Sequence, residues 1–161
     1  MNASVQSPSD VIARHQNACP VDVEAIARDL GIAVAYDVSL GGNVSGKIVK
    51  DERASRSGYA IYINAADNER RQRFTLAHEI AHFVLHRDLI GDGVVDSALY
   101  RSSLSDEHER QANRMAADML LPAPLVRSRY RTEKALSRIS AAFNVSEDAM
   151  RIRLKELRLG A

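Results

Sequence analysis

The chain of 161 residues contains one cysteine, Cys19, has almost no net charge and lacks any long apolar run. A single cysteine excludes an internal disulfide and a metal site built from several thiolates. A helix that spans a bilayer needs about 20 apolar residues in a row, and no segment approaches that length. With 22 Lys+Arg against 21 Asp+Glu, the formal net charge is +1. This balance argues against a protein whose main task is to hold nucleic acid by charge.

The composition is otherwise that of a globular protein. Hydrophobic residues make up 45% of the chain and charged residues 27%, and the length is sufficient for one compact domain with a buried core. The N-terminal residues are polar and lack the apolar core of a signal peptide. We therefore expect a cytoplasmic protein that does not associate with membranes.

Local patterns predict an α+β fold with a short mixed or antiparallel sheet. Residues 59–64, YAIYIN, are apolar on both faces, which is typical of a strand inside a sheet. Two further strands are expected at 32–36 and 46–50, on either side of the Gly41-Gly42-Asn43 turn. Helices are expected to begin at Ser7-Pro8 and Cys19-Pro20 and to cover about 21–30, 67–87, 107–121, 132–143 and 147–157.

Residues 78–82 read His-Glu-Ile-Ala-His and fall inside the long helix expected at 67–87. Two histidines four residues apart lie on the same helical face, so both imidazoles can bind one cation. Neutral imidazole suits Zn²⁺, which a catalytic site holds with three protein ligands and one open position. Glu79 lies beside the pair, where its carboxylate can take a proton from water acidified by the ion. The pattern therefore predicts a zinc site with His78 and His82 as ligands and Glu79 as base, although Mn²⁺ is also compatible with such ligands.

His86 follows four residues later, but it is a poor third ligand. In an unbroken helix it lies about 12 Å along the axis from His78, too far for one tetrahedral ion to bind all three histidines. We expect His86 to contact a ligand rather than the ion, or to occupy the helix end, where the dipole favours a cation.

The third ligand is expected from the helix at 107–121. At roughly 100° per residue, Glu109 and His108 each lie about 50° from the centre of its apolar stripe, on opposite sides. An inward carboxylate is costly unless it meets a cation, which gives Glu109 a reason to be there. Periodicity alone leaves the choice between the two residues open.

Two stretches of the chain resemble the ImmA/IrrE-type metallopeptidases, a group of bacterial and phage zincins. The first is RFTLAHEIAH, residues 73–82, and the second is ExxANxMAAxxLLP, residues 109–122. The segment from Pro20 to Ile32 is similar to the family's opening helix, so the resemblance covers about residues 19–122 and the tail more loosely. Met115 stands where phenylalanine is more usual, an exchange that a core tolerates.

The resemblance implies a small zincin-like metallopeptidase domain in residues 1–125, with the HExxH helix at its active site, and a helical extension over 126–161 packed on the same domain. It implies that His78, His82 and Glu109 bind the metal and that Glu79 is the catalytic base of an endopeptidase. Family members act on helix-turn-helix transcriptional repressors and so switch on stress-response or mobile-element genes. Because the chain has no room for a fused N-terminal helix-turn-helix domain, we expect a repressor substrate on a separate chain.

An oxyanion donor is expected near the second motif, and Tyr100 and Arg101 are the candidates. The alternative to an enzyme is a non-catalytic, metal-containing regulatory module that binds a repressor or DNA. The presence of Glu79 favours the enzyme, because a module that only binds has no need of a base.

The tail is basic, with nine Lys+Arg against four Asp+Glu over residues 127–158. Its last two helices superficially resemble a helix-turn-helix pair, with Ser146 placed to cap the second. We expect a solvated basic face with Ile152, Leu154 and Leu157 packed inward, rather than direct DNA binding. Docking onto a partner protein is the alternative role of this face.

Overall fold

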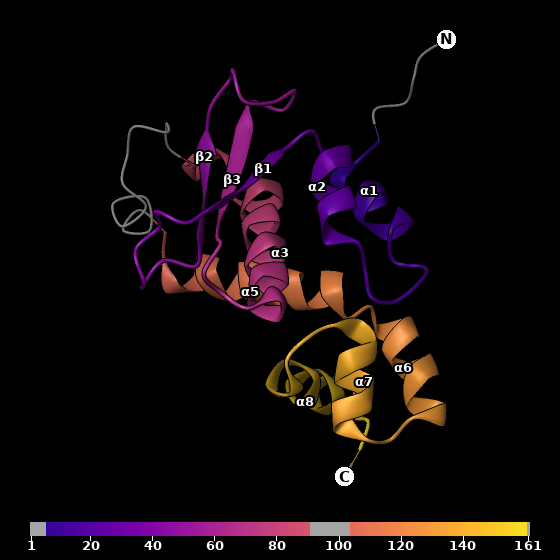
Figure 1. The fold of residues 1–161 in the computed structure, drawn as a ribbon. Helices are drawn as coiled ribbons and strands as arrows, with labels where there is room; N and C mark the ends of the chain where they lie inside the picture. Colours follow the sequence, from indigo (N-terminus) through magenta and orange to yellow (C-terminus); the bar gives the residue numbers. More distant parts are fainter. Residues whose placement is uncertain (1–5, 91–103, 161) are drawn as a thin grey trace.

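A computed structural model describes residues 6–90 and 104–160, which form a three-stranded sheet and helices that pack beside it and below it (Figure 1). In chain order the elements are α1 (Pro8–Arg14), α2 (Val23–Asp29), β1 (Ala33–Asp37), β2 (Gly46–Lys50), β3 (Tyr59–Asn64), α3 (Glu69–Leu85), the 3-10 helix η1 (Arg87–Leu89), α5 (Asp106–Leu120), α6 (Ala123–Thr132), α7 (Leu136–Phe143) and α8 (Glu147–Glu156). The α+β class predicted by the local patterns is confirmed. None of the helices in these two ranges is both long and apolar enough to cross a membrane.

The sheet is mixed, and β3 is its central strand. β1 pairs with β3 in parallel, with Ala33 opposite Ala60, whereas β2 pairs with β3 antiparallel, with Gly46 opposite Ile63. Five of the six β3 residues are buried. This position explains why YAIYIN is apolar on both faces, because a central strand has a neighbour on each edge and covered side chains.

α3 carries the HExxH residues and lies between the sheet and α5 (Figure 1). It begins after Asn68, whose side chain accepts a hydrogen bond from the amide of Arg71. Its buried residues include Leu76 and Ile80, in the same apolar cluster as Ile61 of β3. The contact between α3 and α5 brings together helices that lie far apart in sequence, and so places the two sequence motifs face to face.

The C-terminal helices α6, α7 and α8 gather at one end of α5 (orange to yellow in Figure 1). Val126, Ile139, Phe143 and Met150 belong to the same buried cluster as Ile80 of α3. The extension over 126–161 therefore shares its core with the rest of the chain in the described residues.

The local patterns do not predict α6. Pro122 and Pro124 indicate a helix end, but in the structure Pro122 is the N-cap of α6 and Pro124 lies in its first turn, where no intrahelical N–H bond is needed. The helix expected at 132–143 is accordingly wrong in its first part, since α6 ends at Thr132 and α7 begins at Leu136.

The orientation of α8 also differs from expectation. Leu154 is buried and Leu157 packs partly buried against the core, but Ile152 is 61% exposed. Arg153 takes the inward position instead and is 8% exposed, because its Nε donates a 2.9 Å hydrogen bond to the carbonyl oxygen of Leu121. The expectation that Ile152 packs inward is therefore wrong.

Candidate metal centre

His78 and His82 lie one turn apart on α3, with their imidazoles in contact. The two Nε2 atoms are 3.0 Å apart, and the ring centroids are 4.6 Å apart with the planes nearly perpendicular, at 89°. His82 is buried and His78 is partly exposed. The four-residue spacing thus does what the helical pattern predicts and directs both rings toward one position.

α5 brings Glu109 to this pair. One carboxylate oxygen of Glu109 lies 3.1 Å from Nε2 of His78, and the other lies 3.2 Å from Nε2 of His82. His108, which periodicity leaves as the alternative, has another contact: its Nδ1 accepts a hydrogen bond from the amide of Ser105 and completes the N-terminal cap of α5. The structure therefore gathers His78, His82 and Glu109 into one cluster of possible metal ligands.

The geometry of this cluster fits a divalent cation. A tetrahedral ion with bonds of 2.0–2.1 Å to nitrogen holds neighbouring ligand atoms about 3.3 Å apart. The separations within the cluster are 3.0, 3.1 and 3.2 Å. Two imidazoles and one carboxylate direct their electron pairs at one point, where a positive ion compensates their repulsion, and this donor set suits zinc or manganese.

Both imidazoles are also held at their second nitrogen. Nδ1 of His78 lies 2.9 Å from Oδ1 of Asn113 in α5, and Nδ1 of His82 lies 3.0 Å from Nδ1 of His86. Because the amide oxygen of Asn113 only accepts, His78 donates from Nδ1 and keeps the electron pair of Nε2 for an ion.

The same reasoning assigns the proton of His82. Nε2 of His86 lies 2.8 Å from Oε1 of Gln111, another oxygen that only accepts, so His86 carries its proton on Nε2 and accepts at Nδ1. His82 therefore donates from Nδ1, and its Nε2 also keeps its electron pair. His86 contacts a ligand candidate and ends α3 as its C-cap, as the sequence analysis expects.

Neither Asn113 nor Gln111 has a role that is predicted from the sequence. Asn113 follows Glu109 by four residues on α5, and this spacing indicates that the two share a helical face. Gln111 carries no comparable signal, since its contact with His86 depends on how α5 packs against α3.

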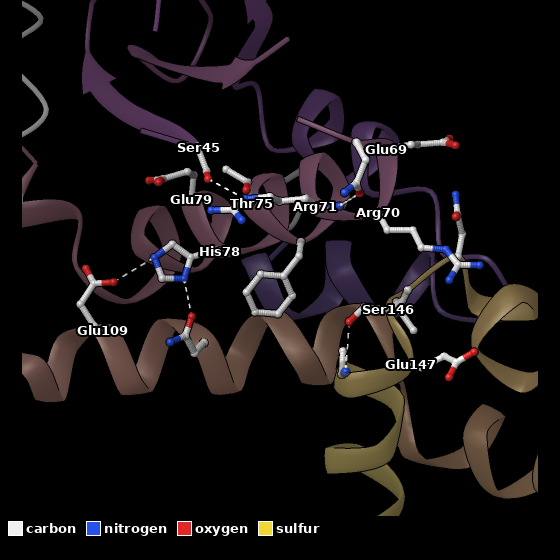
Figure 2. Close-up of a pocket in the computed structure, with 16 residues that line it drawn as sticks. Ser45, Glu69, Arg70, Arg71, Thr75, His78, Glu79, Glu109, Ser146 and Glu147 are labelled. Atoms are coloured by element: carbon white, nitrogen blue, oxygen red, sulfur yellow. Dashed lines mark hydrogen bonds and ion pairs between the residues drawn. The ribbon is translucent and has the colours of Figure 1, made fainter. Parts of the chain in front are cut away.

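The cluster opens into a cleft of about 970 Å³ between α3 and α5 (Figure 2). Glu79 lines this cleft and is only 2% exposed. A carboxylate in this position can exchange a proton with a molecule bound in the cleft. Ser45, which directly precedes β2, lines the cleft beside it. Tyr100 and Arg101, the expected oxyanion donors, lie outside the described residues.

The sequence matches a family model described as peptidase M78, IrrE N-terminal-like domain, over residues 27–155. This range includes both motifs and reaches into α8.

Two curated proteins are similar to this chain. The radiation response metalloprotease IrrE of Deinococcus radiodurans is 34% identical over 102 residues, which cover 60% of this chain and 30% of that protein. The metallopeptidase ImmA of Bacillus subtilis is 30% identical over 106 residues, which cover 65% of this chain and 59% of that protein. The chain thus spans less than two thirds of the length of either relative.

Among solved structures, a Mycobacterium tuberculosis transcriptional regulator has a similar fold, with a TM-score of 0.58 and 18% sequence identity. The similarity covers 83% of this chain and 39% of that chain. At this identity the likeness concerns the fold alone.

Proposed function

This chain belongs to the family of IrrE N-terminal-like metallopeptidases, and we propose that it is a zinc-dependent endopeptidase. The observation that carries the proposal is the convergence of His78, His82 and Glu109 on one position, beside a cleft that His78, Glu79 and Glu109 line. A buried carboxylate is costly for a module that only binds a partner. The same carboxylate has a use in hydrolysis, as a base beside the metal centre.

In this proposal His78, His82 and Glu109 would hold the zinc ion. Bound zinc supplies Lewis-acid chemistry, since it polarises a carbonyl and lowers the pKa of water to about 7. Glu79 takes a proton from the attacking water at its carboxylate and delivers it to the nitrogen of the leaving amine. Asn113 and His86 keep the two imidazoles in the tautomer that presents Nε2 to the ion.

We propose that the substrate is a protein segment bound in an extended conformation along β2, through main-chain hydrogen bonds. β2 lies at one end of the strand order β1-β3-β2 and directly follows Ser45, which lines the cleft. The family resemblance implies a helix-turn-helix transcriptional repressor on a separate chain as the substrate. Its cleavage would derepress stress-response or mobile-element genes, a role that places the protein in the cytoplasm.

The test is incubation of the purified protein with the helix-turn-helix repressor encoded beside its gene, with added zinc or with a chelator. We expect discrete repressor fragments with zinc, none with chelator, and none from the Glu79→Gln variant, although that variant binds as much zinc as the wild type. Fragments from zinc-loaded Glu79→Gln would contradict the role of Glu79. A repressor that binds zinc-loaded wild type but stays intact would indicate a regulatory module instead.

A further inference from the structure

The cleft extends well beyond the metal centre. It runs from His78 and Glu109 at one end to Ser146 and Glu147 at the other (Figure 2). Its far wall is the segment that joins α7 to α8 together with the first turn of α8, residues 144–149, which we name the α7–α8 corner. The C-terminal helices therefore contribute to the same cleft as the candidate catalytic residues.

The α7–α8 corner is anchored to α3. Arg73 of α3 donates from Nε to the carbonyl oxygen of Asn144 at 3.2 Å, and from Nη2 to the carbonyl oxygen of Val21 at 2.9 Å. Burial lowers the pKa of the Arg73 guanidinium below its ordinary value, and the hydrogen bonds offset this desolvation. Val145 is buried in the common core. A wall anchored in this way is preorganised for a ligand.

The cleft also has apolar lining residues. Phe74 lies one turn before His78 on α3, with ring centroids 6.5 Å apart and planes inclined by 30°. Val145 and Ala149 line the cleft from the α7–α8 corner. Four helical residues advance about 6 Å and an extended peptide advances about 3.3 Å per residue. A substrate side chain that packs on Phe74 therefore belongs to a residue about two positions from the peptide bond that lies opposite His78.

The end of the cleft farther from the metal centre is charged. Arg71 reaches back toward Ser45 and is already engaged, with Nε 2.9 Å from Oγ of Ser45 and 3.4 Å from Oδ2 of Asp67. Arg70 and Glu147 line the end farther from the metal centre (Figure 2), and within the described residues neither side chain makes a hydrogen bond or an ion pair. Arg70 lies eight residues before His78. That is about 12 Å along α3, or about three to four residues of extended peptide.

We propose that the α7–α8 corner is the substrate-selecting wall of the peptidase cleft. It accommodates a bulky apolar side chain of the substrate between Phe74 and Ala149, about two residues from the scissile bond. Glu147 and Arg70 contact charged side chains one or two residues farther out. This inference rests on the proposed endopeptidase function and gives the C-terminal helices a part in substrate choice.

The first test compares Ala149→Trp, which fills the apolar part of the cleft, with Ile152→Trp on the exposed face of the same helix. The full-length, zinc-loaded chain digests a mixture of short peptides made from a proteome, and mass spectrometry locates the cleaved bonds. We expect Ala149→Trp to reduce cleavage next to bulky apolar side chains by about tenfold or more, while peptides with glycine or alanine at that position are retained. Ile152→Trp should keep the wild-type profile. An unchanged cleavage profile in folded Ala149→Trp overturns the proposal. If the tryptophan variant does not fold, Ala149→Leu is tested in its place.

A binding measurement separates this proposal from the proposed activity. The Glu79→Gln chain, loaded with zinc, captures peptides from the same mixture, and the Glu79→Gln/Ala149→Trp chain should capture fewer peptides with bulky apolar residues. Failure of the wild type to cleave any peptide would overturn the endopeptidase, whereas equal capture by the two Glu79→Gln chains would overturn the selecting wall.

Glu147 and Asp148 provide a matched pair for the charged end. Both lie in the first turn of α8, but only Glu147 lines the cleft. Glu147→Arg should shift the cleaved peptides toward acidic residues about three to four positions from the scissile bond, and Asp148→Arg should not. Equal shifts in both variants, or no shift in either, would contradict the contact with Glu147.

Discussion

Nδ1 of His82 lies 3.0 Å from Nδ1 of His86, in the protein interior behind the candidate metal centre. His86 in turn contacts Gln111 at 2.8 Å, so His82 is held in one tautomer and one orientation. An outer partner of this kind typically contributes about 10- to 100-fold to metal affinity.

Replacing His86 by leucine is accordingly expected to lower zinc affinity by about 10- to 100-fold. His86→Asn should restore most of this loss, because its side-chain oxygen can accept the hydrogen bond from His82. Competition with a chromogenic chelator measures the affinity, and circular dichroism checks the fold. Wild-type affinity in folded His86→Leu would contradict the prediction.

The two candidates for the third ligand can be separated by matched substitutions. Glu109→Gln removes the negative charge beside both imidazoles. It should reduce zinc affinity by more than about 100-fold, which is the largest effect that an outer partner typically has. His108→Gln keeps a side chain that suits the cap of α5, and so should leave zinc affinity unchanged. The same competition assay measures both. Equal losses in the two variants would mean that Glu109 is not the ligand.

Metal removal should lower the melting temperature. A ligand present at 100 times its Kd stabilises the folded state by about 2.7 kcal/mol. In a chain of this size 1 kcal/mol shifts the melting temperature by about 2–4 °C, so zinc-saturated and chelator-treated protein should differ by about 5–11 °C. Differential scanning fluorimetry measures the shift, and His78→Ala should melt alike in both conditions. An unchanged melting temperature of the wild type on addition of zinc would exclude a tight zinc site.

Arg153 joins α8 to α5. Its Nε donates to the carbonyl oxygen of Leu121 at 2.9 Å, and its Nη1 lies 2.7 Å from Oδ1 of Asp118. Arg153→Met keeps the apolar stem but deprives the buried carbonyl of its donor, and should reduce the free energy of unfolding by about 1–3 kcal/mol. The exposed Arg151 on the same helix is the control, since Arg151→Met should cost less than about 0.5 kcal/mol. Urea unfolding distinguishes the two, and similar costs would contradict the anchoring role.

Gly46, at the start of β2, leaves no room for a side chain against α3. A Cβ atom there would lie 2.5 Å from Cγ2 of Thr75 and 2.9 Å from the carbonyl oxygen of Tyr62. Gly46→Ala should therefore cost about 1–3 kcal/mol of stability in urea unfolding, and Thr75→Ser in the same chain should recover part of it. At Gly42 an added Cβ meets no described atom within 4 Å, so Gly42→Ala should be nearly neutral. A comparable loss at Gly42 would argue against this steric explanation.

The pairing of His78 and His82 could be predicted because it is a local property. Any α-helix places residues four apart on one face, so the HExxH spacing brings two imidazoles together without knowledge of the fold. The central strand at 59–64 could be predicted for a similar reason, since its apolar residues on both faces indicate burial. The local pattern does not predict the start of α6, because proline is tolerated in a first turn but excluded from a helix interior, and the pattern does not distinguish the two.

The sequence by itself therefore determined, within a single helix, that the two histidines and the glutamate that follows the first of them belong to the candidate site. Periodicity left the choice between Glu109 and His108 open, the family resemblance implied Glu109, and the tertiary structure brought Glu109 to both imidazoles. The contact between His86 and Gln111 and the cleft wall at Ala149 depended on tertiary structure alone. Each of these follows from how α5 and α8 are rotated and set against α3. That packing is determined jointly by many side chains that are distant in sequence. A helical period of 3.6 residues carries no information about it.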